Sequence, residues 1–165
     1  MLKIGDRVVY GANGVMKIVD IREESVGDVS RSYYVLSSVS SRSDSLTFVP
    51  TDNEKLVASM RPMLTREAAE DMLSQLSDLP EIEWVQSNRA RVEHFKRIME
   101  SGDRLQMFAM IAAIDENGKR REAEGKKNFL TDETARQKAE KLLYSELSMV
   151  FNIPIEEVPS LINKA

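Results

Sequence analysis

Few side chains in this sequence could act as a catalyst. His94 is the only histidine, and it lies between Glu93 and Phe95 in a stretch with helical spacing. A histidine with a serine or carboxylate neighbour can act as a general base, but the chain has no cysteine to activate and no second imidazole to share a metal. Phosphate-loop, nucleophile-elbow and zinc-protease motifs are missing as well. We therefore expect no enzyme, no metal site and no cofactor, with hydrolysis through His94 as a minor alternative.

Basic side chains that could contact phosphates are a stronger signal, although the chain as a whole is acidic. Residues 85–127 contain ten basic and seven acidic side chains, whereas residues 65–84 contain one basic and six acidic. With a net charge of −4, the chain lacks the positive electrostatic field on which stand-alone nucleic-acid-binding proteins depend. The candidate DNA contacts are Arg89, Arg91, Lys96, Arg97, Lys126 and Lys127. These residues predict weak, sequence-nonspecific DNA contact, and the alternative is an ordinary solvated helix surface.

Trp84, the single tryptophan, lies in the acidic stretch just before these basic residues. Its apolar neighbours Ile82 and Val85 favour packing against the protein, which is the common role of tryptophan. The alternative is a wedge or stacking platform against a base, because an apolar side chain can hold open an unstacked step. Trp84 is therefore a candidate DNA-binding residue, with packing as the favoured reading from sequence alone.

Four aromatic residues of the first half could form a cage for a cation: Tyr10, Tyr33, Tyr34 and Phe48. The simpler interpretation is that aromatic side chains of strands fill a core. Tyr33 and Tyr34 are adjacent, so in a regular strand they point to opposite faces of the sheet. We expect one of the two tyrosines in the core and the other at the surface.

The residues above belong to two regions of different predicted structure. The first sixty residues are rich in strand formers and punctuated by turn residues such as Gly11-Ala12-Asn13-Gly14 and Gly27-Asp28. Strands are predicted at residues 8–10, 15–26, 33–36 and 46–49, with a short fifth strand from Leu56 to Met60. Four or five short strands in so few residues predict a small β-barrel.

Helical spacing replaces this pattern after Arg61-Pro62. Helices are predicted at residues 66–76, 87–100 and 105–114, then from residue 130 to the stop Asn152-Ile153-Pro154, and at 155–162. Thr65, Asp103 and Thr131 are the expected N-caps, and Gly102 is the expected residue after a helix end. The helix that begins near residue 105 either breaks at Asn117-Gly118 or continues through it. The fold class is therefore α+β, with a barrel at residues 1–62 and a helical domain at 63–165.

Composition narrows the class of protein further. Apolar residues make up 42% and charged residues 30% of the chain, which is typical of a folded, soluble protein. No apolar run is long enough to cross a membrane. Residues 1–6 carry charge at once and lack the apolar segment of a secretory signal. We expect a cytoplasmic, monomeric protein without disulfides.

The order and spacing of several short motifs resemble the CarD family of bacterial transcription regulators. In the first half these are Ile4-Gly5-Asp6-Arg7-Val8-Val9-Tyr10 with Asn13-Gly14-Val15, Tyr33-Tyr34-Val35-Leu36, and Phe48-Val49-Pro50-Thr51-Asp52-Asn53. The second half adds Trp84, Arg89, Ser101-Gly102-Asp103, the segment 140–147, and Asn152-Ile153-Pro154. The resemblance covers nearly the whole chain. The opening is also similar to the barrel of the transcription-repair coupling factor, but that protein would continue into a helicase.

The resemblance implies a Tudor-like barrel that docks on the β subunit of bacterial RNA polymerase, partly by pairing an exposed strand with a strand of the polymerase. The candidate polymerase-binding residues are Glu24, Tyr34, Thr47, Phe48, Val49 and Pro50. It further implies that the helical domain meets promoter DNA, that Trp84 enters the minor groove, and that the stability of the open complex changes.

This chain departs from the family at two places. The arginines of the family's polymerase-facing strands have no match in Glu23-Glu24-Ser25 or Thr47-Phe48-Val49, where Phe48 could supply an apolar contact instead. The spacing from Trp84 to Ser101-Gly102-Asp103 is also longer than in the better-known members. An alternative function is therefore kept: an adaptor module that binds a protein or a modified peptide and never meets DNA.

Overall fold

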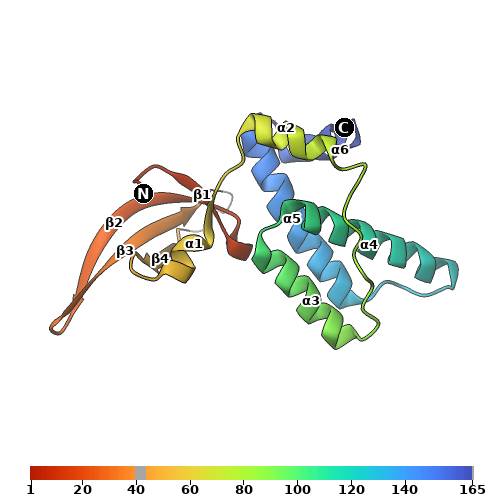
Figure 1. Cartoon of the computed structure of the whole chain (residues 1–165), viewed down its shortest axis with the longest axis horizontal. Helices are drawn as coiled ribbons and strands as arrows, with labels where there is room; N and C mark the ends of the chain where they lie inside the picture. Colours follow the sequence, from red (N-terminus) through yellow and green to blue (C-terminus); the bar gives the residue numbers. More distant parts are fainter. Residues whose placement is uncertain (40–43, 165) are drawn as a thin grey trace. The chain divides into compact units, whose positions relative to one another are not determined.

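Two units of different secondary structure make up the chain in the computed structural model, which describes residues 1–39 and 44–164 (Figure 1). The strands lie before Leu64, and the described residues from Thr65 to Lys164 are mainly helical. The chain is therefore an α+β protein, as the sequence predicts. The two compact units meet after Leu64. The domain boundaries given above, residues 1–62 and 63–165, stay a prediction.

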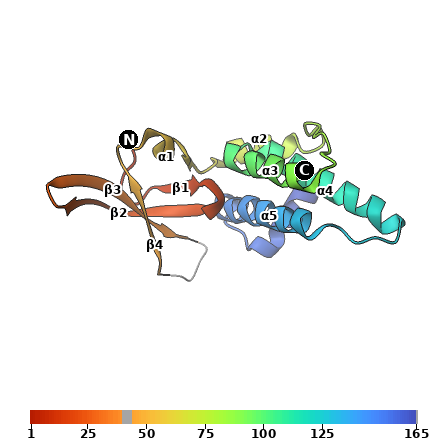
Figure 2. The ribbon, with the colours of Figure 1, turned by 90° about the horizontal axis from the view of Figure 1, so that it is seen from below.

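The first unit is built on one antiparallel five-stranded sheet (Figure 2). Its strands are β1 (Arg7–Tyr10), β2 (Val15–Val26), β3 (Val29–Ser38), β4 (Leu46–Pro50) and β5 (Met60–Pro62), in the spatial order β4-β3-β2-β1-β5. Within the described residues β4 and β5 form the two edges and do not pair with each other. The sheet is thus not closed by strand pairing, and the Tudor-like barrel stays a prediction.

One face of this sheet carries the core of the first unit. Val8, Met16, Ile18, Leu36 and Val49 are almost completely buried there. Tyr34 joins them, whereas Tyr33 is only partly buried. The expectation that the adjacent tyrosines point to opposite faces is confirmed, because alternation along a strand separates neighbours.

A short helix stands where the sequence suggested a fifth strand. Leu56 and Val57 belong to α1 (Glu54–Ala58), and the strand β5 begins only at Met60. The Asn53 side chain accepts a hydrogen bond from the Leu56 N–H at 3.1 Å, which satisfies a free amide at the helix start. The cap acts together with the helix-forming residues Glu54, Lys55 and Ala58, and Leu56 and Val57 pack against the sheet core from the helix.

The hairpin of β2 and β3 extends as an arm beyond the rest of the sheet (Figure 1). The register shifts between Ile18 and Asp20, which marks a β-bulge, and every side chain from Ile21 to Arg31 is exposed. Gly27 makes the turn with a positive φ of 62°. Because neither face of the arm is covered, its strands are held by their hydrogen-bond ladder rather than by a core.

The second unit consists of α2 (Arg66–Ser74), α3 (Asn88–Ser101), α4 (Arg104–Ala123), α5 (Leu130–Phe151) and α6 (Val158–Asn163), with a 3-10 turn at Ile155–Glu157. The helices α3, α4 and α5 pack against one another. Phe95, Ile98, Met110, Ile114 and Leu147 are among their buried side chains. Within the described residues, none of these helices combines the length and apolarity that crossing a membrane requires.

Most of the expected helix ends are confirmed. Thr65 accepts a hydrogen bond from Ala68 N–H at 3.1 Å, and Asp103 accepts one from Gln106 N–H at 3.1 Å. Gly102 has the positive φ of 68° that suits a residue after a helix end. Helix α4 continues through Asn117 without a break, as one of the two alternatives allowed.

The expected cap at Thr131 is wrong. Helix α5 begins at Leu130 after the N-cap residue Phe129, so Thr131 lies inside the first turn. Asp132 and Glu133 supply negative charge to this turn, where the helix dipole is positive. The ring of Phe129 lies near the guanidinium groups of Arg91 and Arg121, so side-chain packing replaces a capping hydrogen bond at this helix start.

Candidate functional site

The outer edge of β4 is the first candidate site. The Thr51 N–H donates to the Ser32 carbonyl at 3.0 Å, and the register pairs Val49 with Tyr34. Because hydrogen bonding alternates along an antiparallel pair, Val49 and Thr47 direct their backbone groups to β3. The backbone groups of Leu46 and Phe48 therefore point to the other side, where the described residues provide no further strand.

The six predicted polymerase-binding residues differ in what they can offer a partner. Phe48 is 44% exposed, and Thr47 and Pro50 are partly exposed on the same strand. The side chains of Tyr34 and Val49 lie in the core, and their backbone groups face each other across β3 and β4, so neither residue is a direct contact. Glu24 is exposed opposite Arg31 on the hairpin arm, beyond the part of β3 that pairs with β4.

Phe48 is the centre of a small surface of aromatic and charged side chains on the face of the sheet opposite the core. The Tyr33 ring meets it edge-on, with ring centroids 6.2 Å apart. The guanidinium carbon of Arg22 lies 5.8 Å from the Phe48 ring centroid, and Arg22 also pairs with Asp20 at 3.1 Å. Sequence reasoning did not select Arg22; the alternation along β2, which places it opposite Tyr33, could have found it.

The four aromatic residues do not form one cation cage. Tyr34 lies in the core and Tyr10 packs against it, whereas Tyr33 and Phe48 meet on the opposite face. The Tyr33–Phe48 pair already has the cation of Arg22 beside it. The simpler interpretation, in which strand aromatics pack on the two faces of a sheet, accounts for all four side chains.

The second candidate site surrounds Trp84, which lies in the extended segment between α2 and α3. The indole is partly buried, and it meets the Phe95 ring with centroids 6.0 Å apart. It also lines a hollow of about 690 Å³ between this segment and α4. Ala109, Ala112 and Ala113 form the apolar side of the hollow, and Glu81, Glu83, Glu116 and Arg120 are its charged residues. Trp84 thus packs against Phe95 and also lines an open hollow whose charged residues are mostly acidic.

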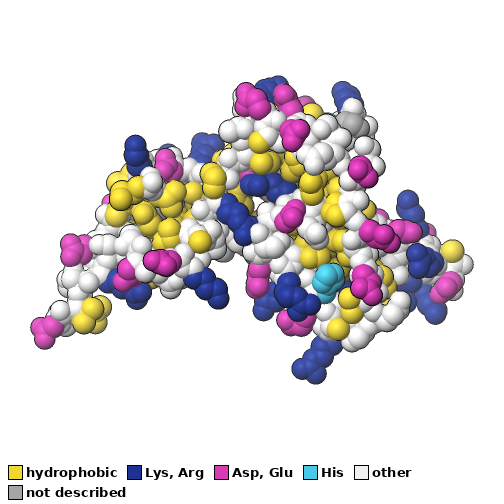
Figure 3. Space-filling view, viewed as in Figure 1, with side chains coloured by type: hydrophobic (Ala, Val, Ile, Leu, Met, Phe, Trp, Pro, Cys, Tyr) yellow, Lys and Arg dark blue, Asp and Glu magenta, His cyan; other side chains and the backbone are white. Residues whose placement is uncertain are grey.

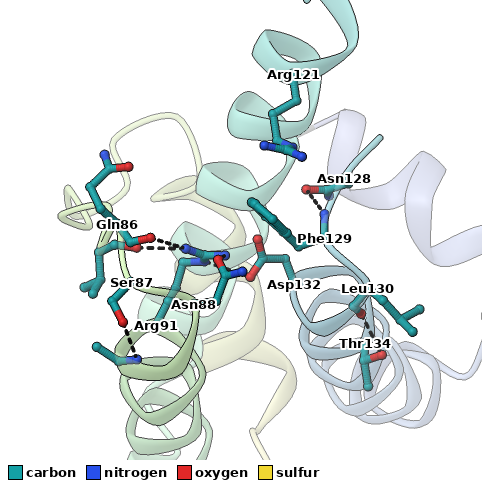
Figure 4. A network of polar contacts seen from close by, with 12 residues as sticks. Gln86, Ser87, Asn88, Arg91, Arg121, Asn128, Phe129, Leu130, Asp132 and Thr134 are labelled. Atoms are coloured by element: carbon teal, nitrogen blue, oxygen red, sulfur yellow. Dashed lines mark hydrogen bonds and ion pairs between the residues drawn. The ribbon is translucent and has the colours of Figure 1, made fainter. Parts of the chain in front are cut away.

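Arg91, predicted to bind DNA, is 1% exposed and has a different role (Figure 4). Its Nε donates to Asp132 Oδ1 at 2.8 Å, and its Nη1 donates to the Val85 carbonyl at 2.9 Å. Its Nη2 donates to Asn88 Oδ1 at 2.6 Å. A guanidinium that is hydrogen-bonded to internal partners and shielded from solvent cannot contact a phosphate. Arg91 therefore joins the first turns of α3 and α5 and leaves the set of DNA contacts.

The other predicted basic contacts are exposed. Arg89, Lys96 and Arg97 lie on α3, and Lys126 and Lys127 lie in the connection between α4 and α5. Lys126 is 3.6 Å from Glu124, and acidic and basic side chains are interspersed on the visible face of the helical unit (Figure 3). These cations form scattered points of contact rather than one basic patch.

Arg136 pairs with one of the acidic residues in the hollow that Lys126 and Lys127 also line, Asp115. Arg136 pairs with Asp115 at 2.6 Å and with Glu140 at 2.9 Å. Burial lowers the pKa of Arg136, but the hydrogen bond and charge of Asp115, together with the charges of Glu140 and Glu133, raise that pKa overall. Burial, aided by Glu140, raises the pKa of Tyr144 nearby. Lys126, which pairs with Glu124, and Lys127 lie outside the Arg136 pairs, and both are exposed.

His94, the candidate general base, lies on α3 and is partly buried. His94 packs beside the Phe95 ring, with centroids 6.0 Å apart. Among residues 1–39 and 44–164, no three metal-ligating side chains lie together. The two candidate sites remain the open edge of β4 and the Trp84 segment.

Comparison with known proteins addresses the first of these sites. Residues 2–64 match the model of the CarD-like/TRCF RID domain family. A search of curated proteins found no match for the chain. The family is a protein-interaction domain without enzymatic activity that binds the β subunit of RNA polymerase. The first unit of this chain, which presents the open β4 edge, therefore matches a family of domains that interact with RNA polymerase.

Proposed function

We propose that this chain docks on the β subunit of bacterial RNA polymerase through β4 and contacts upstream promoter DNA through its helical unit, which changes the lifetime of the open complex. The observation that carries the proposal is the open edge of β4 in a domain of the CarD-like/TRCF RID family. Such a role would place the chain in the cytoplasm, where it would work as a monomer beside the polymerase.

Strand addition is the mode of docking that the edge supports. The outward backbone groups of Leu46 and Phe48 supply main-chain hydrogen bonds, which provide affinity, and neighbouring side chains provide specificity. Phe48, flanked by Tyr33 and Arg22, is the apolar anchor. An exposed aromatic residue with a cation beside it has the chemistry of an interface hot spot.

DNA contact is proposed for the exposed basic residues of the helical unit: Arg89, Lys96, Arg97, Lys126 and Lys127. These scattered cations are too few for tight binding in free solution. Tethering to polymerase raises the effective concentration of DNA to about the millimolar range, so weak phosphate contacts become sufficient. Trp84 is the candidate for an apolar contact at an unstacked base step.

A second candidate function is an adaptor that binds polymerase and a further protein without touching DNA. One observation favours it: the hollow beside Trp84 contains Glu81, Glu83 and Glu116, which would repel phosphates. Promoter DNA added to the polymerase complex would then leave the fluorescence of Trp84 unchanged.

The test of docking compares the wild-type chain with two matched variants for binding to a fragment of the polymerase β subunit. Phe48→Asp is expected to weaken binding by at least about tenfold, because it replaces the proposed anchor. Val29→Asp makes the same kind of change at another exposed apolar strand residue, at the tip of the hairpin arm, and should bind normally. Equal binding by both variants would remove β4 as the docking strand.

The test of DNA contact measures the lifetime of open complexes with full-length chains. Wild type should change the lifetime, Phe48→Asp should abolish the effect, and Lys126→Ala/Lys127→Ala should reduce it while binding to polymerase is kept. If wild type binds polymerase but leaves the lifetime unaltered, the adaptor function replaces the regulator.

A further inference from the structure

The guanidinium of Arg91 donates hydrogen bonds to the segment that contains Trp84. It donates to the carbonyl of Val85 at 2.9 Å and to the carbonyl of Gln86 at 3.3 Å. The guanidinium carbon also lies 4.7 Å from the centroid of the Trp84 ring. One side chain of α3 thus fixes both the ring of Trp84 and the two residues that follow it.

Asp132 fixes the guanidinium in turn. The carboxylate comes from the first turn of α5, and both partners of the ion pair are 1% exposed. The fork of a guanidinium lets Nε bond Asp132 while Nη1 and Nη2 reach other acceptors, which a lysine ammonium cannot do in the same geometry. The pair therefore connects α5 to the Trp84 segment through Arg91.

The contacts continue from Arg91 to the connection between α4 and α5. Figure 4 shows the Phe129 ring between Arg91 and Arg121, whose guanidinium carbons lie 5.1 Å and 3.9 Å from its centroid. The Nε of Arg121 donates to the Lys127 carbonyl at 2.8 Å. The same cluster thus reaches from Trp84 to the backbone of Lys127.

We infer that Arg91 and Asp132 are positioning residues: their ion pair holds the Trp84 ring and the Lys126-Lys127 connection in fixed relation, so that both can meet one DNA partner. The inference rests on the proposed function for the identity of that partner. The fixed placement of Trp84 itself follows from the contacts within the helical unit.

Stability alone is a poor explanation for this arrangement. A buried ion pair loses so much hydration that apolar residues of similar volume often stabilise a protein equally well or better. Here the cost is not fully offset, because the buried Oδ2 of Asp132 has no hydrogen-bond partner among the described residues. What the pair adds over an apolar core is the directional hold on the carbonyls of Val85 and Gln86.

Trp84 provides its own readout, because it is the only tryptophan of the chain. Arg91→Lys keeps the charge beside Asp132 but loses the fork that reaches the carbonyls. The double variant Arg91→Met/Asp132→Leu removes both charges and preserves apolar packing, so it should fold. Both variants should show red-shifted Trp84 emission and stronger quenching by acrylamide. Both should also lose the wild-type effect on open-complex lifetime while binding the polymerase β fragment normally.

The matched control is Arg104→Lys, which alters another largely buried arginine–carboxylate pair of the same unit, Arg104 with Glu146. It should leave the emission and quenching of Trp84 as in wild type, which separates positioning from a general loss of stability. Wild-type emission and quenching in a folded Arg91→Lys and a folded double variant would overturn the inference. If wild type itself has no effect on the open complex, the proposed function fails, and the fluorescence still decides whether Arg91 positions Trp84.

Discussion

Arg91 Nε lies 2.8 Å from Asp132 Oδ1, and this bond joins side chains 41 positions apart in the chain. It brings together the starts of α3 and α5, which both belong to the helical unit. The CarD-like domain match ends at residue 64, so this contact organises the part of the chain whose role is inferred from its own geometry.

Removing one partner of this pair should strongly destabilise the helical unit. Asp132→Ala leaves the Arg91 charge buried without its counter-ion, which costs about 3–5 kcal/mol. The double variant Arg91→Met/Asp132→Leu should recover most of the free energy of unfolding, since it leaves no charge uncompensated. Urea denaturation of the single and double variants measures both values. A single variant as stable as wild type would show that the pair is open to water.

The edge of β4 can be tested through its backbone. Leu46→Pro removes an N–H that points away from β3, at the first residue of the strand, where proline is tolerated. It should weaken binding to the polymerase β fragment with little change in the unfolding midpoint. Thr47→Pro removes an N–H that bonds β3 and should lower the midpoint. Normal polymerase binding by Leu46→Pro would argue against strand addition at this edge.

Phosphate contact by the α4–α5 connection predicts a specific response to salt. In the polymerase complex, Lys126→Ala/Lys127→Ala should reduce the slope of log affinity for promoter DNA against log salt by roughly 2, about one per lost contact. Lys138→Ala/Lys141→Ala removes the same charge from exposed positions on α5 and should leave the slope unchanged. Equal slopes for the two double variants would mean that only net charge matters.

The cap of α1 should contribute to the stability of the first unit. Asn53→Ala removes the acceptor of the Leu56 N–H and should lower the free energy of unfolding by about 1 kcal/mol. Asn53→Asp keeps an acceptor and should restore most of it. Asp52→Ala, which breaks only the exposed pair with Arg31, is the neighbouring control and should have little effect. Thermal unfolding of the three variants compares them directly.

Tyr144 should make the helical unit sensitive to alkali. Burial, with Glu140 adding to it, raises the pKa of this phenol above its ordinary 10.0. The protonated form is therefore favoured in the folded state, and its stabilisation is complete below the unfolded pKa. As pH rises above 10.0 the unfolded chain loses the proton first, so stability falls until the folded pKa is passed. Tyr144→Phe should show a smaller loss of urea midpoint across this range, and an unchanged loss would assign it to other groups.

Much of the fold follows from short-range signals. Alternation separates Tyr33 from Tyr34, and side-chain acceptors at Thr65 and Asp103 fix the starts of α2 and α4. The start of α5 was misplaced because Phe129 is held by packing against arginines, which no local capping rule describes. The prediction of a fifth strand from Leu56 to Met60 overlooks helix α1, which the Asn53 cap and the helix formers Glu54, Lys55 and Ala58 favour.

The candidate site was harder to predict, since it depends on pairs that are distant in sequence. Arg91 was grouped with exposed cations, although it lies four and seven residues before the buried Phe95 and Ile98, on the same helix face. Asp132 likewise lies seven residues before the buried Ala139 on its own helix. A charge on each of two apolar stripes is the sequence signal of a buried ion pair, and it could have identified both residues.

The five residues of β4 also affect whether this chain associates with other copies of itself. An open strand edge that accepts a strand of polymerase is equally a template for edge-to-edge aggregation. Here the strand is short and ends at Pro50, which has no N–H to donate, and the Arg22–Asp20 pair beside Phe48 places charge next to the apolar surface. A second copy would gain few hydrogen bonds from such an edge, so in the proposed docking the selectivity for polymerase would rest on an edge too short to sustain self-assembly.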